Sequence, residues 1–260
     1  MSDSENLEDS RAPIIDHLKE LRTRLLYSFA ALLLAFLVCF YFSNNIFNFL
    51  AAPLSDLWQD QEQRRMIFTA LHEKFFTDVK IAFFASFCIA FPVLISQIWL
   101  FVAPGLFQNE KKAFLPFLLM TPVLFLMGAS FVYYLMVPVA WEFFLGFEQS
   151  AGQGHMAIVL EPKVSEYLSL IMRLILAFGV CFELPVLLVL LVRAGITDSQ
   201  GLIDKRRYAI LLAFVIAAIV TPPDPISQIS LAIPIILLYE ISIICAKMIE
   251  RKAAKKDQEI

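Results

Sequence analysis

Six long apolar runs, separated by polar or charged connections, make up most of the chain. The first, Leu25–Phe42, has 18 residues without a charge and extends about 27 Å as a helix, just enough for the apolar core of a bilayer. Segments of this length and composition are typical of transmembrane helices, so we predict an all-α membrane protein with six transmembrane helices. The predicted spans cover about residues 25–42, 79–103, 113–140, 167–192, 208–221 and 226–246.

The last two runs are short for membrane spans. Tyr208–Thr221 has 14 residues, and Ile226–Tyr239 has the same length if that run is ended before Glu240. Fourteen residues extend about 21 Å as a helix, against about 30 Å for the apolar core of a bilayer. The turn TPPDP joins the two runs, so we expect a hairpin of two short helices that thins the bilayer locally.

Two polar segments flank this six-span domain, which we place at residues 13–249. Residues 1–12 are mostly acidic and polar, unlike the basic start of a cleaved signal peptide, and we expect them to form a disordered tail. Residues 250–260 are strongly charged and form a second tail. The four cysteines lie inside apolar runs and form no CxxC pair, so we interpret them as small hydrophobic side chains.

The segment His17–Leu26, HLKELRTRLL, mixes both signs of charge just before the first run. Apolar positions in and before it recur at helical spacing and form one stripe: Ile14, Leu18, Leu21 and Leu25. A helix at the membrane surface would explain this stripe and the cations, but not Glu20. Either Glu20 pairs with Arg24 one turn away, which is worth about 0.3–0.5 kcal/mol, or it is kept for a ligand.

The distribution of basic residues indicates how the spans are oriented. Hydrophobic residues make up 59% of the chain, against about 45–50% in soluble domains, which indicates a membrane protein. The N-terminal segment, residues 104–112, residues 193–207 and the C-terminal tail hold 15 of the 21 Lys and Arg residues, whereas residues 43–77 and 141–166 hold four. Because cytoplasmic connections carry the excess of Lys and Arg, both termini are predicted to be cytoplasmic.

Four charges lie inside the apolar runs, and one of them, Glu240, is near the far end of the last run. Glu183, in FELP, lies deepest, and a carboxyl group at such depth usually faces a cavity or a partner. Pro185 leaves the carbonyl of Cys181 without its helical donor, which makes the backbone there polar as well. Glu183 is therefore either a structural group bonded to a neighbouring helix or part of a water-exposed groove. Arg173 and Lys80 lie near the outer ends of their runs, where their side chains reach the membrane surface.

Further polar residues lie at the ends of the runs. Asp224, just before the last run, is suited to cap its helix, and Gln228 is suited to bond an adjacent helix. Asn109 is suited to cap the third run, which places Glu110 in the first turn, where the helix dipole favours an anion. Alternatively, Glu110 and Glu20 form a pair of carboxylates at the cytoplasmic face that binds the guanidinium groups of a peptide with two cations.

The sequence does not contain the motifs of the common enzyme classes. The three histidines lie in connections, and His72-Glu73 begins like a zinc-protease motif whose second histidine is replaced by Phe76. No GxSxG, P-loop or Rossmann fingerprint occurs. We therefore expect no enzyme activity, no metal and no cofactor.

Five segments, taken in order, resemble the twin-arginine translocation protein C (TatC) family. They are HLKELRTRLL, SNNIFNFLAAPL, QIWLFVAPGLFQNEKK, FGVCFELPV and TPPDPISQ, and the resemblance extends from about Ile14 to Ile249. It implies a concave, glove-shaped bundle of six helices that serves as the core receptor of the Tat pathway. That pathway exports folded proteins with Arg-Arg signal peptides across the bacterial inner membrane and is driven by the proton-motive force.

The resemblance also implies partners and site residues. It implies two single-span partner proteins, similar to TatA and TatB, an oligomeric complex in the lipid membrane, and no binding of nucleic acid. The family's signal-peptide site matches Glu20, Arg22, Phe101 and Glu110. Glu183 matches the glutamate exposed in the concave face, and Pro53 matches a proline of an outer loop. The partner-docking region matches Thr221, Asp224 and Gln228.

The chain departs from the family pattern at two places. Thr23 stands where the family often has Lys, and Gln108-Asn109 precede Glu110 where some members carry basic residues, so the local positive charge is lower. Two other functions fit part of the sequence. A proton-coupled secondary transporter of a small solute would use Glu183 as its relay, and a membrane scaffold would tolerate the loss of both cytoplasmic carboxylates.

Overall fold

The computed structural model describes residues 2–58, 64–106, 111–149, 158–221 and 225–258. Over these ranges the chain is helical and has no β-strand, as predicted. In this part of the chain, five segments are long and apolar enough to cross a membrane: His17–Tyr41, Glu73–Phe101, Phe117–Leu145, Val164–Arg193 and Ser227–Arg251. They match five of the six predicted spans.

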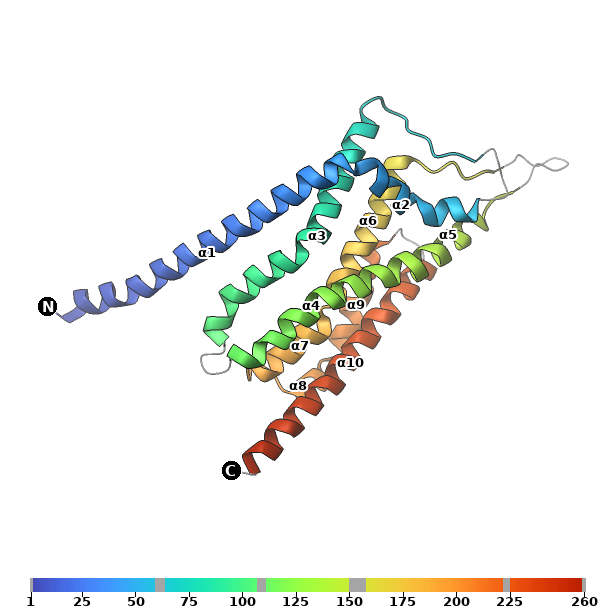
Figure 1. Cartoon of the computed structure of the whole chain (residues 1–260). Helices are drawn as coiled ribbons and strands as arrows, with labels where there is room; N and C mark the ends of the chain where they lie inside the picture. The colour runs from blue at the N-terminus through green and yellow to red at the C-terminus, as the bar shows by residue number, and fades with distance from the viewer. Residues whose placement is uncertain (1, 59–63, 107–110, 150–157, 222–224, 259–260) are drawn as a thin grey trace.

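The helices run back and forth between two ends of a bundle. In chain order they are α1 (Ser2–Tyr41), α2 (Ser43–Leu57), α3 (Glu73–Leu106), α4 (Lys111–Phe131), the π-helix η1 (Val132–Met136), α5 (Val137–Leu145), α6 (Val164–Cys181), α7 (Leu184–Arg193), α8 (Ser199–Asp204), α9 (Arg206–Val220) and α10 (Pro225–Gln258). Both termini lie at one end, here called the terminal end (Figure 1). The opposite end, here called the cap end, carries α2 and the connections that precede α3 and α6 (Figure 1).

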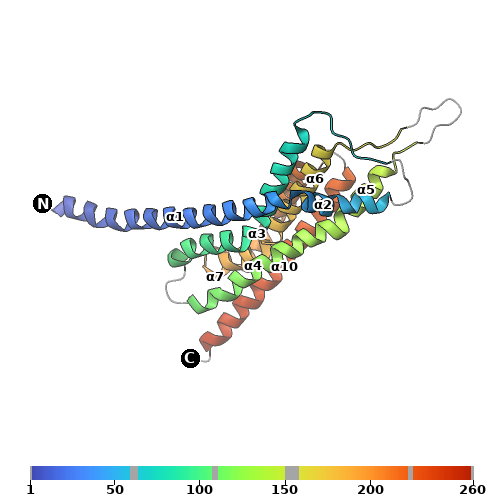
Figure 2. The same ribbon diagram turned by 45° about the horizontal axis from the view of Figure 1, so that its top comes forward.

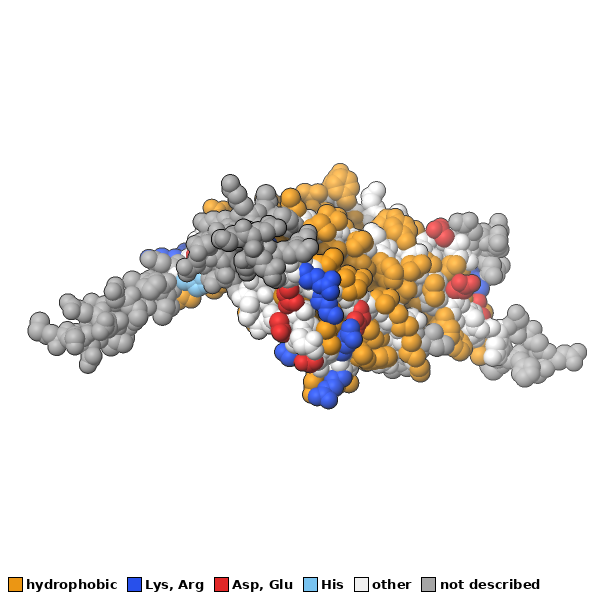
Figure 3. Space-filling model, turned by 90° about the horizontal axis from the view of Figure 1, so that it is seen from below, with side chains coloured by type: hydrophobic (Ala, Val, Ile, Leu, Met, Phe, Trp, Pro, Cys, Tyr) orange, Lys and Arg blue, Asp and Glu red, His pale blue; other side chains and the backbone are white. Residues whose placement is uncertain are grey.

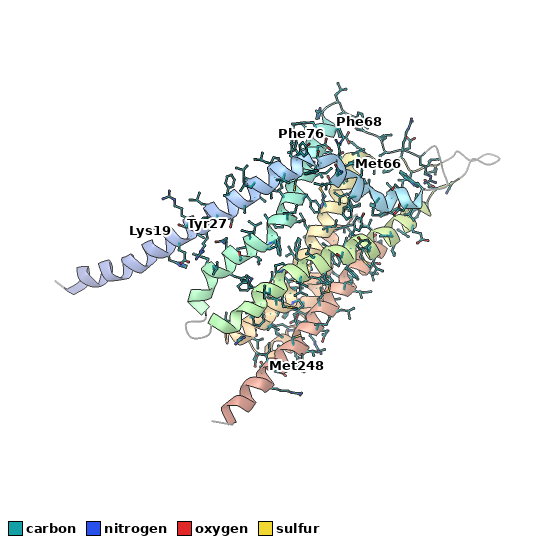
Figure 4. All side chains as sticks on the ribbon, in the orientation of Figure 1. Lys19, Tyr27, Met66, Phe68, Phe76 and Met248 are labelled. Carbon is teal, nitrogen blue, oxygen red and sulfur yellow. The ribbon has the colours of Figure 1, made fainter. Side chains whose placement is uncertain are left out.

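A second view shows the same arrangement, with α1 extending away from the other helices toward its N-terminus (Figure 2). Met66, Phe68 and Phe76 lie at the cap end, whereas Lys19 and Met248 lie nearer the terminal end (Figure 4). On the face drawn in Figure 3, charged side chains gather in two groups separated by apolar side chains. This is the distribution expected of a protein that crosses a bilayer several times.

The two helices of the predicted hairpin differ in length. α9 has 15 residues and extends about 22 Å, so it is short, as predicted. α10 has 34 residues, so the prediction of a short last helix is wrong. Glu240 does not end α10, because its carboxylate pairs with Arg206 of α9 at 2.6 Å between Nη2 and Oε2. α1 differs from the prediction too, since it begins at Ser2, within the segment expected to be disordered.

α2 lies in the connection after α1, where the sequence suggested only a loop, and Pro53 is buried inside this helix. A proline inside a helix lacks the N–H that would donate to the carbonyl four residues earlier, here that of Phe49. The hydroxyl of Tyr133 on η1 donates to this carbonyl at 2.6 Å, and the rings of Tyr133 and Phe49 stack with centroids 4.5 Å apart. The hydroxyl of Tyr167 on α6 donates to the next carbonyl, that of Leu50, at 3.1 Å. Two tyrosines therefore attach α2 to the bundle.

Two glycines let α4 and α6 approach closely. A Cβ atom on Gly179 of α6 would lie 2.5 Å from the ring of Phe125 on α4. A Cβ atom on Gly128 of α4 would lie 2.7 Å from the carbonyl oxygen of Phe178 on α6. Phe125 and Phe178 are both fully buried, so the centre of the bundle is filled by aromatic rings that pack on glycine.

Ion pairs and backbone hydrogen bonds close the cap end. The guanidinium group of Arg64 donates to both carboxylate oxygens of Glu148, with Nη1–Oε1 3.0 Å and Nη2–Oε2 2.6 Å. The N–H of Leu160 donates to the same carboxylate at 2.9 Å, and the N–H of Ile67 donates to the carbonyl of Pro162 at 3.1 Å. The connections that precede α3 and α6 are thus joined directly, which the sequence did not predict.

At the terminal end, α8 is held against α10. The carboxylate of Glu250 accepts hydrogen bonds from the N–H of Ser199, at 2.7 Å, and from its hydroxyl. The hydroxyl of Tyr239 on α10 donates to the carbonyl of Leu202 on α8 at 2.7 Å. The predicted loop of residues 193–207 is therefore partly helical and packed against the last helix.

Replacing Tyr133 with Phe should lower the free energy of unfolding by about 0.5–1.5 kcal/mol, because the Phe49 carbonyl would lose the donor that replaces the missing N–H of Pro53. In Pro53→Ala, residue 53 regains the N–H that donates to the Phe49 carbonyl. Replacing Tyr133 with Phe in that variant should therefore lower the free energy of unfolding much less. Unfolding of the four proteins of this double-mutant cycle in detergent micelles measures the difference. An equal cost in both backgrounds would mean that the hydroxyl does not replace the bond that Pro53 removes.

The cap end should weaken in acid. Burial raises the pKa of Glu148, but the Leu160 N–H and the Arg64 guanidinium outweigh burial and hold it below the ordinary value of 4.5. A carboxyl group whose pKa is lowered by folding adds stability above its ordinary pKa, and this stability is lost as the pH falls through the lowered value. At neutral pH the unmodified protein should therefore unfold at a higher temperature than Glu148→Gln. This difference in unfolding temperature should disappear as the pH falls below about 4.5. A constant difference from about pH 7 down to about pH 3 would contradict this account.

Candidate functional site

Two of the residues expected to bind a cationic peptide, Glu20 and Phe101, lie where α1 meets α3 near the terminal end. The imidazole ring of His17 on α1 stacks on the ring of Phe101 on α3, with centroids 4.3 Å apart and planes inclined by 14°. Two turns further along α1, Nη1 of Arg24 donates to Oε1 of Gln97 on α3 at 3.4 Å. These two contacts hold the start of the first span against the end of the second.

Glu20 lies between these two contacts on α1. Its Oε1 atom accepts a hydrogen bond from Nη2 of Arg24 at 3.2 Å, so the pair with Arg24 suggested by the sequence is formed. The Glu20 side chain is 35% exposed and that of Arg24 is 29% exposed. An exposed pair one helical turn apart is worth only about 0.3–0.5 kcal/mol. A cationic ligand can therefore replace Arg24 as the partner of Glu20 at a small cost in free energy. The side chain of Gln97 can still accept its hydrogen bond from Arg24.

The structure says less about the other two residues of the expected site, Arg22 and Glu110. Arg22 is exposed on α1, two residues from Glu20. Glu110 lies outside the described residues, which end at Leu106 of α3 and resume at Lys111 of α4. The structure therefore brings Glu20 and Phe101 to one place, whereas the pairing of Glu20 with Glu110 stays a prediction.

Glu183 lies at the interruption between α6 and α7. α6 ends at Cys181 and α7 begins at Leu184, and Pro185 in the first turn of α7 accounts for this break within the predicted span 167–192. The carboxyl group of Glu183 faces Thr121 on α4. Its Oε1 atom is buried without a hydrogen-bond partner among the described residues. A carboxyl group left partly unsatisfied in the middle of a span is costly, so packing alone does not explain it.

The polar residues of the hairpin bond within the hairpin. The hydroxyl of Thr221, at the end of α9, is buried and donates to the carbonyl of Ala217 at 2.8 Å. The side-chain amide of Gln228 on α10 donates to the carbonyl of Phe214 on α9 at 3.2 Å, so the predicted bond to an adjacent helix is formed. Asp224 lies outside the described residues, and its role as a helix cap stays a prediction.

Some residues of the site gave only a weak signal in the sequence. Gln97 is a single amide within an apolar run, and His17 looked like one of several histidines in connections. Both become meaningful once α3 is known to pack against the face of α1 that carries His17 and Arg24, whereas Leu18 and Leu25 of the predicted stripe are exposed. Among the described residues, no group of three His, Cys, Asp or Glu side chains is arranged to hold a metal ion.

Comparison with known proteins places this arrangement in a family. The model of the family described as Sec-independent protein translocase protein (TatC) matches residues 16–234 of the chain. A Sec-independent protein translocase protein TatC of Magnetococcus marinus is 53% identical over 249 residues, which are 96% of this chain and 89% of the relative. One of Rickettsia prowazekii is 45% identical over 235 residues, 90% of this chain and 92% of the relative.

A solved structure is similar to this fold as well. The crystal structure of a twin arginine translocase receptor, TatC, matches with a TM-score of 0.75 at 39% sequence identity. The match covers 89% of this chain and 98% of that one. A second crystal structure of such a receptor, in the detergent DDM, matches with a TM-score of 0.77 at 38% identity.

Replacing Glu183 with Leu should raise the free energy of unfolding by about 1 kcal/mol, because it removes a buried carboxyl oxygen that has no described partner. Thermal unfolding in detergent micelles measures the change. Glu166→Leu on α6 is the control for the loss of a carboxylate, since that side chain is 79% exposed and its replacement should change stability by less than about 0.5 kcal/mol. A lower stability of Glu183→Leu would mean that the carboxyl group is part of the packing of the bundle.

Proposed function

Because the chain belongs to the TatC family of Sec-independent protein translocase proteins, we propose that it is the signal-peptide receptor subunit of a twin-arginine translocase. In this role it takes part in the export of folded proteins with Arg-Arg signal peptides across the inner membrane, driven by the proton-motive force. It recognises and holds the cargo's signal peptide, and no step of this task requires the chain to catalyse a reaction.

The observation that supports a receptor site is the weak internal pair at Glu20. A carboxylate that is one-third exposed and bonded to a guanidinium group of its own helix presents the geometry that an incoming arginine needs. Arg24 occupies the position until the ligand arrives, and then keeps its bond to Gln97. The ligand arginine makes a charge-assisted hydrogen bond that is stronger when both carboxylate oxygens take part.

Two arginines need two anionic partners, and the second is Glu110. Phe101 contributes aromatic surface beside Glu20, on which a guanidinium plane can stack, and Arg22 sets the position of the neighbouring peptide by repulsion. Because the surrounding connections are basic, these two carboxylates provide the local negative charge that a cationic peptide requires. The site thus selects for a pair of arginines rather than for positive charge in general.

The site must face the cytoplasm for this function. Both termini lie at the terminal end of the bundle (Figure 1). This agrees with the excess of Lys and Arg in the segments predicted to be cytoplasmic. We assign the terminal end to the cytoplasm and the cap end to the opposite side of the membrane. Signal peptides are made in the cytoplasm, so this orientation presents Glu20 to them.

The α9–α10 hairpin receives the single-span partners similar to TatA and TatB. Thr221 and Gln228 shape this hairpin through their own hydrogen bonds, so partner helices contact it through apolar side chains. Leu211, Leu212 and Ile219 of α9 are exposed and available for such contacts. The short α9 thins the bilayer beside the partners, and Glu183 provides a polar group on the concave side of the bundle.

Replacing Glu20 with Gln should weaken binding of an Arg-Arg signal peptide to the purified chain by about 10- to 100-fold. One charge-assisted hydrogen bond is worth about 1.5–3 kcal/mol, and a factor of ten is about 1.4 kcal/mol. Fluorescence anisotropy with a labelled peptide measures the affinity. Arg24→Gln should not weaken binding, because it removes only the cation that the peptide displaces.

Glu240→Gln is the matched control for Glu20→Gln, because it removes a partly exposed carboxylate that is also paired with an arginine. Its affinity for the peptide should stay within about twofold of the unmodified chain. Equal losses of peptide affinity in Glu20→Gln and Glu240→Gln would mean that the effect comes from the loss of negative charge in general and not from a site at Glu20. An unchanged affinity of Glu20→Gln would contradict the proposed receptor site.

A further inference from the structure

A groove of 970 Å³ lies between the helices toward the cap end, and charged groups line it. Three cations border it: Lys80 of α3, Arg173 of α6, and Lys163, which immediately precedes α6. Two carboxylates border it as well, those of Glu161 and Glu166. The proposed receptor site lies near the terminal end and uses none of these residues.

The two carboxylates and Lys163 already have partners. Nζ of Lys163 lies 3.9 Å from the carboxylate of Glu166 and 4.0 Å from that of Glu73. The carboxylate of Glu161 lies 3.8 Å from the guanidinium group of Arg65. The carboxylate of Glu161 is therefore paired with a cation outside the groove, and that of Glu166 with Lys163 of the groove itself.

Lys80 and Arg173 form no ion pair with any residue that the structure describes, and both are exposed. Lys80 lies seven residues into the span that begins at Glu73, and Arg173 nine residues into the span that begins at Val164. At 1.5 Å per residue, they lie about 10 and 14 Å inward from these helix ends. Two exposed cations on neighbouring helices, without an ion pair among the described residues, can together bind an anion from outside the chain.

An apolar groove of 870 Å³ continues from this charged one. Side chains of α1, α3 and α6 line it, among them Phe29, Leu33, Phe83 and Met172. Lys80 and Ser169 belong to the walls of both grooves, so the two are connected. The combined space is charged toward the cap end and apolar below it, which are the two parts of a phospholipid in the same order.

We propose that this space is a binding site for one anionic phospholipid of the leaflet at the cap end. The lipid phosphate lies between Lys80 and Arg173, and an acyl chain fills the apolar groove between α1, α3 and α6. Charge complementarity selects the occupant, because a headgroup with net negative charge neutralises the two cations. A zwitterionic headgroup brings its own cation and binds less tightly.

The site differs from cations that merely extend to the membrane surface. Such cations contact whichever headgroups are nearby and show no preference that depends on a groove. A built site requires both the cations and the apolar groove, so blocking the groove must abolish the preference while both cations are still present.

Native mass spectrometry of the purified full chain in detergent tests the proposal with phosphatidylglycerol and phosphatidylcholine of identical acyl chains. The chain should retain one phosphatidylglycerol in preference to phosphatidylcholine. Lys80→Gln and Arg173→Gln should each weaken this binding about fivefold, and the double variant about 25-fold. Lys80→Arg should bind as the unmodified chain does. Ser169→Phe, which places a ring where the two grooves meet, should abolish the preference.

Lys74→Gln is the matched control, because Lys74 is a cation of the same helix that pairs with Asp78 and does not line the groove. It should leave phosphatidylglycerol binding unchanged, and thermal unfolding confirms that each variant is folded. Equal binding of the two lipids, or an equal loss with Lys74→Gln, overturns the proposal. Recovery of a peptide or a second copy of the chain in place of the lipid also overturns it.

Discussion

A backbone carbonyl packed between helices needs a hydrogen-bond donor, and this constraint shapes the bundle. Pro53 interrupts the hydrogen bonds of α2, and the hydroxyl of Tyr133 from η1 bonds the carbonyl of Phe49 instead. In the hairpin, the amide of Gln228 bonds the carbonyl of Phe214 on the facing helix. Each of these side chains belongs to a different helix from the carbonyl it bonds, so satisfying the backbone also sets how the helices pack.

The two ends of the bundle hold their charges with different strength. At the cap end, Arg64 and Glu148 form two hydrogen bonds, and their side chains are only 14% and 20% exposed. At the terminal end, Glu20 accepts one hydrogen bond from Arg24, and both side chains are about one-third exposed. A buried bidentate pair resists exchange, whereas a single exposed bond is easily replaced. The terminal end is therefore the place where we propose that an arginine of a ligand replaces an internal one.

The sequence predicts what depends on local pattern and misses what depends on distant partners. Apolar runs predicted the long helices, but α2 looked like a loop because its short apolar stretch contains Pro53, and Glu240 suggested an early end to α10 because its partner lies on α9. At the candidate site, the bond of Glu20 to Arg24 follows from a spacing of four residues. The bond of Arg24 to Gln97 joins residues 73 positions apart, and no local pattern specifies it.

We propose that Glu20 exchanges Arg24 for an arginine of the signal peptide. The most direct measurement is a cryo-electron microscopy structure of the chain with a bound Arg-Arg signal peptide. We predict a guanidinium group of the peptide within about 3 Å of the Glu20 carboxylate, with Arg24 released from Glu20 and still bonded to Gln97. A bound peptide that leaves the pair of Glu20 and Arg24 intact would contradict the account.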